Sequence, residues 1–207
     1  IVFPIAKSCE ALEIVKKMSD WCYFGSKNMS DKDFQKMLVS EHGGMCEVMA
    51  DLYGITKDPK YLYLAKRFTQ KSVIDPLSKG IDSLQGMHAN TQIPKIIGAA
   101  RLYELTGDDY YGNAAKFFFN TVVNHRSFVI GGNSVSEHFG PSDVENLAKD
   151  SCETCNTYNM LKLAEHLFSW EHDAKYADYY ERALYNHILA SQDSETGAKT
   201  YFVSTYQ

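Results

Sequence analysis

The residues best suited to chemistry in this sequence lie between Gly131 and Phe168. Glu137 follows a pair of glycines, and Glu153 and Cys155 come later, at the predicted start of a long amphipathic helix. A carboxyl group on a glycine-rich loop can approach a substrate and act as a general acid or base. Carboxylate oxygen and thiolate sulfur are both zinc ligands. These residue types predict acid–base catalysis, a zinc site, or both.

Each of these residues also has a purely structural interpretation. A loop glutamate such as Glu137 is usually a solvated charge. Glu153 at a helix start would interact with the helix dipole and form a capping box with Asp150 at the cap. Cys155 would fill a small apolar space. Cys152 and Cys155 form a C-x-x-C pair, but no βαβ pattern surrounds it, which argues against a redox motif.

A zinc centre takes about four ligands, and Glu153 and Cys155 supply two. Cys152, His88 and His138 are further candidates in the sequence.

Two histidines stand out by their local context. His42 and His88 each lie in a loop that contains glycine and precedes a predicted helix. They are therefore not on the apolar face of a helix, which favours ligand binding for both.

A sequence repeat predicts the elements that position these residues. Residues 52–61 correspond to residues 102–111, and a weaker third copy covers 167–176. In each copy an apolar-periodic helix ends, an aspartate caps the next helix, and an aromatic residue three positions later packs back on the first. The repeat predicts three αα-hairpins, with caps at Asp58, Asp108 and Asp173.

Long inserts at 73–90 and 123–149 separate the copies. Solenoid repeats usually recur every 34–47 residues or so without such inserts, whereas loops collected at one end of a helical barrel suit a ligand cleft. We therefore expect an all-α fold, a partial (α/α)6 toroid over residues 1–195. The polarity alternates along the next residues, so 196–207 is predicted to start a β-rich region.

Helical signals also occur outside the repeat. An apolar stripe predicts a helix over 10–21, and Ser30 is predicted to cap a short helix over 32–39. Pro94 is expected in the first turn of the helix that follows His88, where proline is tolerated.

Composition excludes several classes of protein. The 207 residues carry a net charge of −5 with a pI near 5.8, which argues against nucleic acid as a partner. No run approaches the ~20 apolar residues of a membrane span, and the first residues lack a signal-peptide pattern. Five cysteines without a disulfide spacing favour reduced thiols. We expect a cytoplasmic protein, or a periplasmic one after signal removal.

Four stretches of the sequence occur together in one family. In this order they resemble the bacterial β-L-arabinofuranosidase family, glycoside hydrolase families 127 and 146, over most of the chain from about residue 41. The stretches are EHGGM (Glu41–Met45), GMHANTQIPKIIGAARLYELTGD (Gly86–Asp108), GGNSVSEHF (Gly131–Phe139) and ETCNTYNMLKL (Glu153–Leu163).

The resemblance implies a retaining hydrolase on an (α/α)6 barrel followed by β-sandwich domains. It implies that a zinc-bound cysteine thiolate is the nucleophile and that one glutamate and three cysteines hold the zinc. By position, Glu137 is then the general acid/base, and Glu153 and Cys155 are zinc ligands. The residues that would bind the sugar are His88, His42, Asn90 and Gln92.

The sequence departs from this pattern in one respect. The family's nucleophile and remaining ligand come from an adjacent Cys-Cys pair, yet no cysteine follows Cys155. We therefore expect a fragment that lacks the nucleophile and is inactive alone. A partial barrel would expose apolar surface, so self-association is expected.

The sequence therefore predicts a hydrolase that releases terminal β-L-arabinofuranose from plant-type glycans or glycoproteins. One alternative is a metal-independent (α/α)-toroid glycosidase or lyase acting on other plant sugars. The other is a carbohydrate-binding or helical scaffold module without catalysis. Cys155→Ser would leave metal content and turnover unchanged in that last case.

Overall fold

The protein folds into α-helices arranged as antiparallel pairs. In a computed structural model, which describes residues 8–206, the helices are α2 (Cys9–Ser26), α3 (Asp31–Met37), α4 (Met45–Thr56), α5 (Pro59–Arg67), α6 (Lys71–Ser78), α7 (Ala89–Thr106), α8 (Asp109–His125), α9 (Thr154–Glu171) and α10 (Ala174–Ala183), which continues into a π-helix, η1 (Leu184–Leu189). None of these helices is long and apolar enough to cross a membrane.

The three predicted αα-hairpins are confirmed as α4–α5, α7–α8 and α9–α10. Each first helix ends in a left-handed residue, and the next residue is an aspartate that accepts the N–H two positions on. The aromatic residues three positions past the caps are buried: Tyr61, Tyr111 and Tyr176.

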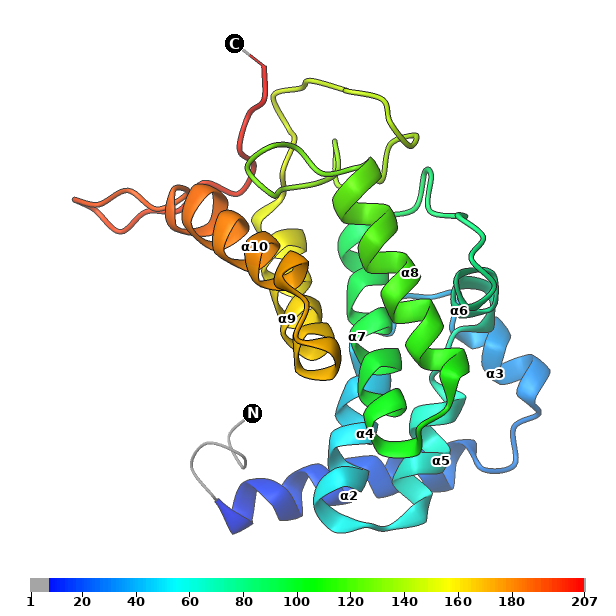
Figure 1. Ribbon diagram of the computed structural model, residues 1–207. Helices are drawn as coiled ribbons and strands as arrows, with labels where there is room; N and C mark the ends of the chain where they lie inside the picture. Colours follow the sequence, from blue (N-terminus) through cyan, green and yellow to red (C-terminus); the bar gives the residue numbers. More distant parts are fainter. Residues whose placement is uncertain (1–7, 207) are drawn as a thin grey trace.

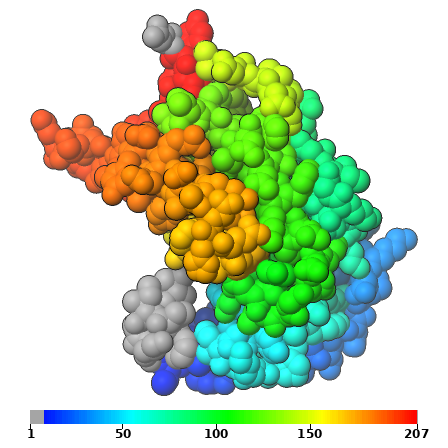
Figure 2. Space-filling model, in the orientation of Figure 1, coloured from blue at the N-terminus to red at the C-terminus, as the bar shows by residue number. Residues whose placement is uncertain are grey.

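The first helices of the hairpins form one layer, with α7 packed between α4 and α9 (Figure 1). The second helices α5, α8 and α10 pack on the outside of this layer, and the segment after η1 projects from the body (Figure 2). Ten residues of α7 are buried, so it forms the centre of the core. This all-α arrangement of an inner and an outer helical layer confirms the toroid-like architecture.

Several local predictions need correction. The helix predicted at 10–21 extends over Cys9–Ser26, but its apolar stripe faces outward, with Trp21 79% exposed. The short helix predicted at 32–39 spans Asp31–Met37, and α6 occupies the start of the insert predicted to be irregular. Pro94 lies inside α7 rather than in its first turn, so the carbonyl one turn earlier has no proline N–H to accept.

Backbone pairing in the described part of the chain is limited to isolated bridges. His88 pairs with His138, Val135 with Ser151, and Glu153 with Phe202. These bridges join the loops that precede α7 and α9 to the segment after η1. The segment at 196–206 contributes single bridges rather than a continuous strand.

Candidate functional site

Most of the predicted site residues gather at the end of the helical layer where α7 and α9 begin, and His42 lies apart from them. His42 precedes α4, His88 is the N-cap of α7, and Glu153 is the N-cap of α9. The three helices run in the same direction; α7 and α9 begin at one end, whereas α4 begins alongside the middle of α7, where Cys46 lies against Gly98 (Figure 1). The dipoles of α7 and α9 present partial positive charge at the end where these two helices begin.

The loop that carries Glu137 is held against the start of α7. Ala89 N–H donates to the Glu137 carbonyl at 2.7 Å, Phe139 N–H to Met87 at 2.9 Å, and Gly86 N–H to Phe139 at 2.8 Å. Glu137 itself has a φ of +65°, a left-handed conformation that is unfavourable for a residue with a Cβ. Such backbone strain is typical of functional sites.

The loop before α9 is held by two distant segments. Cys152 N–H donates to the Ser134 carbonyl at 3.2 Å, which ties this loop to the one that carries Glu137. Thr154 N–H donates to the Tyr201 carbonyl at 3.1 Å, and Val203 N–H donates to the Cys152 carbonyl at 3.3 Å. The segment after η1 therefore crosses the beginning of α9.

The Tyr201 hydroxyl joins the two candidate carboxylates. Its oxygen lies 2.7 Å from Glu153 Oε1 and 3.0 Å from Glu137 Oε1. The hydrogen bond to Glu153, burial and the hydrogen bond to Glu137 raise the pKa of Tyr201, so the phenol keeps its proton and donates. His88 Nε2 lies 3.4 Å from the other oxygen of Glu137. Glu137, Glu153, Tyr201 and His88 thus form one cluster, here called the carboxylate cluster.

Glu153 does not form the predicted capping box. It occupies the N-cap position, yet its side chain caps no helical N–H, and Asp150 instead accepts from the Ser136 hydroxyl. Glu153 is only 1% exposed, and its Oε2 atom is buried without a hydrogen-bond partner among residues 8–206. An unpaired buried carboxylate oxygen is costly, and it is an arrangement that a bound cation would stabilise.

Cys155 lies beside this carboxylate. Burial, a hydrogen bond to Glu153 and the charge of Glu153 raise the pKa of the Cys155 thiol, so a thiolate here would need a neighbouring cation. The buried, unpaired oxygen of Glu153 and the adjacent sulfur therefore fit a zinc ion as two of its ligands.

The structure does not supply the further zinc ligands considered from the sequence. Cys152 is fully buried and contacts Gly132 and His187, and His138 packs edge-on against His88 with ring centroids 5.3 Å apart. No three His, Cys, Asp or Glu side chains in residues 8–206 form a group that could hold a metal ion.

The polar residues at the start of α7 differ in how many of their side-chain atoms are already hydrogen-bonded within the protein. His88 Nδ1 accepts the Thr91 N–H at 3.3 Å, which leaves Nε2 directed at Glu137. Asn90 accepts from Asn159 at 2.8 Å. Gln92 is 7% exposed and donates to the His88 carbonyl at 3.3 Å, so it helps to hold the backbone of His88 in place.

His42 belongs to a separate buried group. Burial, followed by the charge of Lys95, lowers the pKa of His42, and its Nε2 has no partner among the described residues. Lys95 is 6% exposed and donates to Gln70 at 2.6 Å and to Gln92 at 2.9 Å; burial lowers its pKa to about 8. Within residues 8–206 no hydrogen bond joins His42 to the carboxylate cluster; its Nδ1 lies 3.4 Å from the Ser40 carbonyl.

Two polar residues at this end were missed in the sequence. Tyr201 lies in a segment whose alternating pattern predicts only β structure, and Lys95 directly follows Pro94 and is buried. His88, Gln92 and Lys95 are spaced at i, i+4 and i+7, which is the signal of one helical face and could have identified Lys95.

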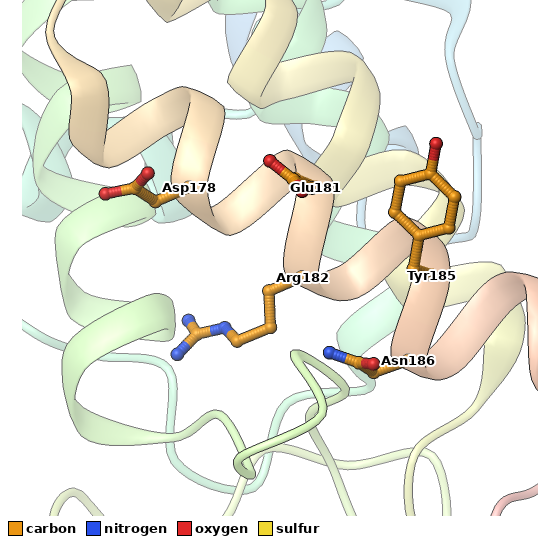
Figure 3. A pocket seen from close by; sticks show the side chains of 5 residues that line it. All are labelled: Asp178, Glu181, Arg182, Tyr185 and Asn186. Atoms are coloured by element: carbon orange, nitrogen blue, oxygen red, sulfur yellow. The ribbon is translucent and has the colours of Figure 1, made fainter.

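A surface pocket of about 370 Å³ lies elsewhere, on α10 and η1 (Figure 3). All five side chains that line it are exposed, and none belongs to the carboxylate cluster: Asp178, Glu181, Arg182, Tyr185 and Asn186.

Comparison with known proteins gives a consistent result. Residues 2–206 match the family model described as the β-L-arabinofuranosidase GH127 catalytic domain. A non-reducing end β-L-arabinofuranosidase of Bifidobacterium longum subsp. longum is 25% identical, over 96% of this chain and 34% of the relative. The chain thus spans about a third of the length of that curated relative.

Solved structures also resemble the fold. A GH127 β-arabinofuranosidase superposes with a TM-score of 0.67 at 26% identity, covering 77% of this chain and 27% of that one. A GH127 β-L-arabinofuranosidase from Geobacillus stearothermophilus T6 gives a TM-score of 0.65 at 21% identity, covering 76% and 30%. At that identity the second similarity concerns the fold alone.

Proposed function

This chain belongs to the GH127 family of β-L-arabinofuranosidase catalytic domains, and we propose that it supplies the acid–base and zinc-binding residues of a retaining glycoside hydrolase. The proposed substrate is a carbohydrate that ends in β-linked L-arabinofuranose, as in plant-type glycans or glycoproteins. The family match and the activities named for its relatives support this substrate class.

The observation that carries the proposal is the Tyr201 hydroxyl between Glu137 and Glu153. A phenol has one proton, and the shorter contact assigns it to Glu153. The same hydroxyl also lies 3.0 Å from Glu137 Oε1, so it is shared between the two carboxylates and fixes the position of Glu137. A carboxyl group held in one position is suited to protonate the leaving oxygen of a glycoside.

Glu137 then acts twice in the proposed reaction. It first gives its proton to the leaving oxygen, and it later takes a proton from the water that releases the sugar. His88, 3.4 Å from Glu137, hydrogen-bonds the sugar and keeps the carboxyl oriented. The Glu137 side chain lies between the N-cap of α7, His88, and Tyr201.

Glu153 and Cys155 would hold a zinc ion, which when bound keeps cysteine sulfur deprotonated at neutral pH and thereby supplies a nucleophile. In the family the nucleophile is a further zinc-bound cysteine, and no cysteine follows Cys155 in this sequence. The two oxygens of the buried Glu153 carboxylate would have different roles. Oε1 accepts from Tyr201, and Oε2, which has no partner in the described part of the chain, would bind the ion.

A metal-independent retaining mechanism is the second candidate. Glu137 and Glu153 both contact the same phenol oxygen, so they are closer than the ~6.5–9.5 Å between the carboxylates of inverting enzymes. In that mechanism Glu153 would be the nucleophile. However, Glu153 is 1% exposed, which gives a sugar little access and favours the role of ligand.

Hydrolysis of an aryl β-L-arabinofuranoside tests the proposal, measured in a protein in which this chain is joined to the segment that carries the Cys-Cys pair of the family; all activities below refer to this joined protein. Glu137→Gln should lower kcat/KM by at least about 100-fold, because the acid is lost. Glu145→Gln is the matched control, since it removes an exposed carboxylate from the same insert. Equal activity of Glu137→Gln and the unmodified protein would reject the assignment.

Metal content separates the two mechanisms. About one zinc per protein, with activity lost on chelation and restored by zinc, is expected for the zinc mechanism. Undiminished hydrolysis by the metal-free protein would favour the carboxylate mechanism.

A further inference from the structure

His187 is a fully buried histidine that the proposed reaction does not use. Its Nε2 lies 2.9 Å from the Cys152 carbonyl and its Nδ1 lies 2.8 Å from the Thr157 hydroxyl. A carbonyl oxygen can only accept, so Nε2 carries the proton and Nδ1 accepts from Thr157. Burial lowers the pKa of His187, which keeps the ring neutral and this arrangement of protons constant.

The ring reaches this position from the π-helix η1. A π-turn holds one residue more than an α-turn and rotates the side chains that follow it, and such turns are frequent at functional sites. Tyr185 and Asn186 point outward into the surface pocket (Figure 3), whereas the next residue, His187, is 0% exposed. The helix therefore presents opposite faces to solvent and to the loop before α9.

The carbonyl that His187 holds belongs to the peptide bond leading into Glu153. Cys152 has a φ of +52°, so its backbone would favour another conformation without outside support. Glu153 makes no capping bond to α9 that could orient it. Its side chain is directed by the Tyr201 hydroxyl, which donates to Oε1 at 2.7 Å, and by the peptide before it, which His187 and the Val203 N–H hold at 2.9 and 3.3 Å.

Gly131 and Gly132 allow the loop before α9 to approach His187 and α10 closely. A Cβ at Gly132 would lie 2.7 Å from Cys152 Sγ and 3.0 Å from His187 Cε1. A Cβ at Gly131 would lie 2.6 Å from Ala183 Cβ at the end of α10. The backbone of the two glycines thus packs directly against both the ring and the loop.

We infer that His187 is a positioning residue that directs Glu153 into the site by holding the Cys152 carbonyl. The inference rests on the proposed function, because Glu153 matters there as a zinc ligand and as the partner of Tyr201. Groups that orient ligands from outside a metal site change affinity by about 10- to 100-fold when removed.

Three variants test the inference. His187→Leu removes the donor to Cys152, and His187→Gln keeps an amide N–H able to reach the same carbonyl. Tyr179→Phe is the matched control. It also removes a buried hydrogen bond to the backbone beside the site, because the Tyr179 hydroxyl donates to the Gly131 carbonyl at 3.0 Å. Each variant is measured for thermal unfolding, for amide hydrogen exchange at Val203 and for zinc affinity by chelator competition.

His187→Leu should speed exchange at Val203 by about 10-fold or more and weaken zinc binding by about 10- to 100-fold. His187→Gln should restore most of both, and Tyr179→Phe should lower the Tm without changing either. If His187→Leu does not fold, Thr157→Val replaces it, with a smaller effect in the same direction. Equal responses from His187→Leu and Tyr179→Phe would overturn the inference.

The exchange measurement needs neither zinc nor substrate. If the protein joined to the Cys-Cys segment binds no zinc and hydrolyses no arabinofuranoside, the proposed function is disproved, while exchange at Val203 still decides whether His187 holds the loop.

Discussion

The two ends of the layer formed by α4, α7 and α9 differ in how their polar groups are paired. At the end with the hairpin turns, Thr56 and Thr106 donate to carbonyls one turn earlier and accept the N–H of Asp58 and Asp108. The two aspartates then cap the following helices. Here short-range hydrogen bonds satisfy the turn.

The end with the carboxylate cluster is built differently. Side-chain atoms of three residues are buried there without partners in the described part of the chain: Asn133, Glu153 and Asn156. In the described connection between α8 and α9, five residues other than glycine adopt left-handed φ angles, against two at the turn end, Lys57 and His172. The five are Ser134, Ser136, Glu137, Asp143 and Cys152.

We interpret this difference as a division of roles: one end of the helical layer stabilises the fold, and the other carries the site. Unpaired buried groups and strained backbone each cost free energy, and they persist only where the surrounding structure holds them. The hairpin turns and the core of α7 contribute that stability. We therefore expect substitutions at the turn end to change stability alone, and substitutions at the cluster end to change activity first.

The largest expected effect is that of Glu153→Gln. Hydrolysis should fall by at least about 100-fold, because the proposed zinc ligand and the partner of Tyr201 are lost. The free energy of unfolding of the chelator-treated protein should stay the same or rise, since a buried charge with an unpaired oxygen is removed. Normal turnover combined with lower stability would show that Glu153 has a structural role, and the two ends of the helical layer would then not differ in function.

Glycine-to-alanine substitutions compare the two ends directly. Gly132→Ala would place a Cβ 2.7 Å from Cys152 Cβ and Sγ and should cost about 1–3 kcal/mol along with activity. In Gly107→Ala the new Cβ would meet no atom within 4 Å, so only the backbone φ of +69° is unfavourable, and the variant should lose about 1 kcal/mol of stability. Urea denaturation and kcat/KM of both variants check this, and loss of activity in Gly107→Ala would contradict it.

Acid titration tests the turn end at Glu104. Burial opposes ionisation, but hydrogen bonds from His166, Trp170 and Arg101 outweigh it and hold the pKa of Glu104 at about 2. A lowered pKa stabilises the fold above the ordinary value near 4.5, and this contribution is lost as pH falls toward 2.

Glu104→Gln should therefore lower the free energy of unfolding by about 1–3 kcal/mol at neutral pH. The difference from the unmodified protein should shrink between about pH 4.5 and 2, with kcat/KM at neutral pH unchanged. A difference that does not depend on pH would mean that the charge of Glu104 is not the stabilising feature.

The smallest effect is expected at a helix cap. Asp108→Ala removes the acceptor for the Tyr110 N–H and should cost about 1 kcal/mol, whereas Asp108→Asn keeps an acceptor and should cost less. Thermal unfolding measures both variants. Hydrolysis should be unaffected, so a fall in turnover would connect this turn to the site.

Much of the helical architecture could be predicted because it depends on neighbouring residues. The hairpin turns follow from the Thr-x-Asp pattern in two copies and from aspartate caps in all three, since a cap acts on an N–H two positions away. The buried aromatic residues after each cap follow from helical spacing. Trp21 marks the limit of this reasoning, because a helical stripe predicts a helix but not what covers it.

The sequence by itself determined the hairpins, their caps and the residue types with chemical potential: Glu137, Glu153, Cys155 and His88. Only the tertiary structure decided that a phenol lies between two of those carboxylates, from a residue 64 positions after Glu137 and 48 after Glu153. It also decided that Glu153 leaves its own helix uncapped and that a π-turn brings His187 to the preceding carbonyl. The physical reason is range: caps and turns form within one helical turn, whereas the cluster forms only after α7 and α9 pack side by side.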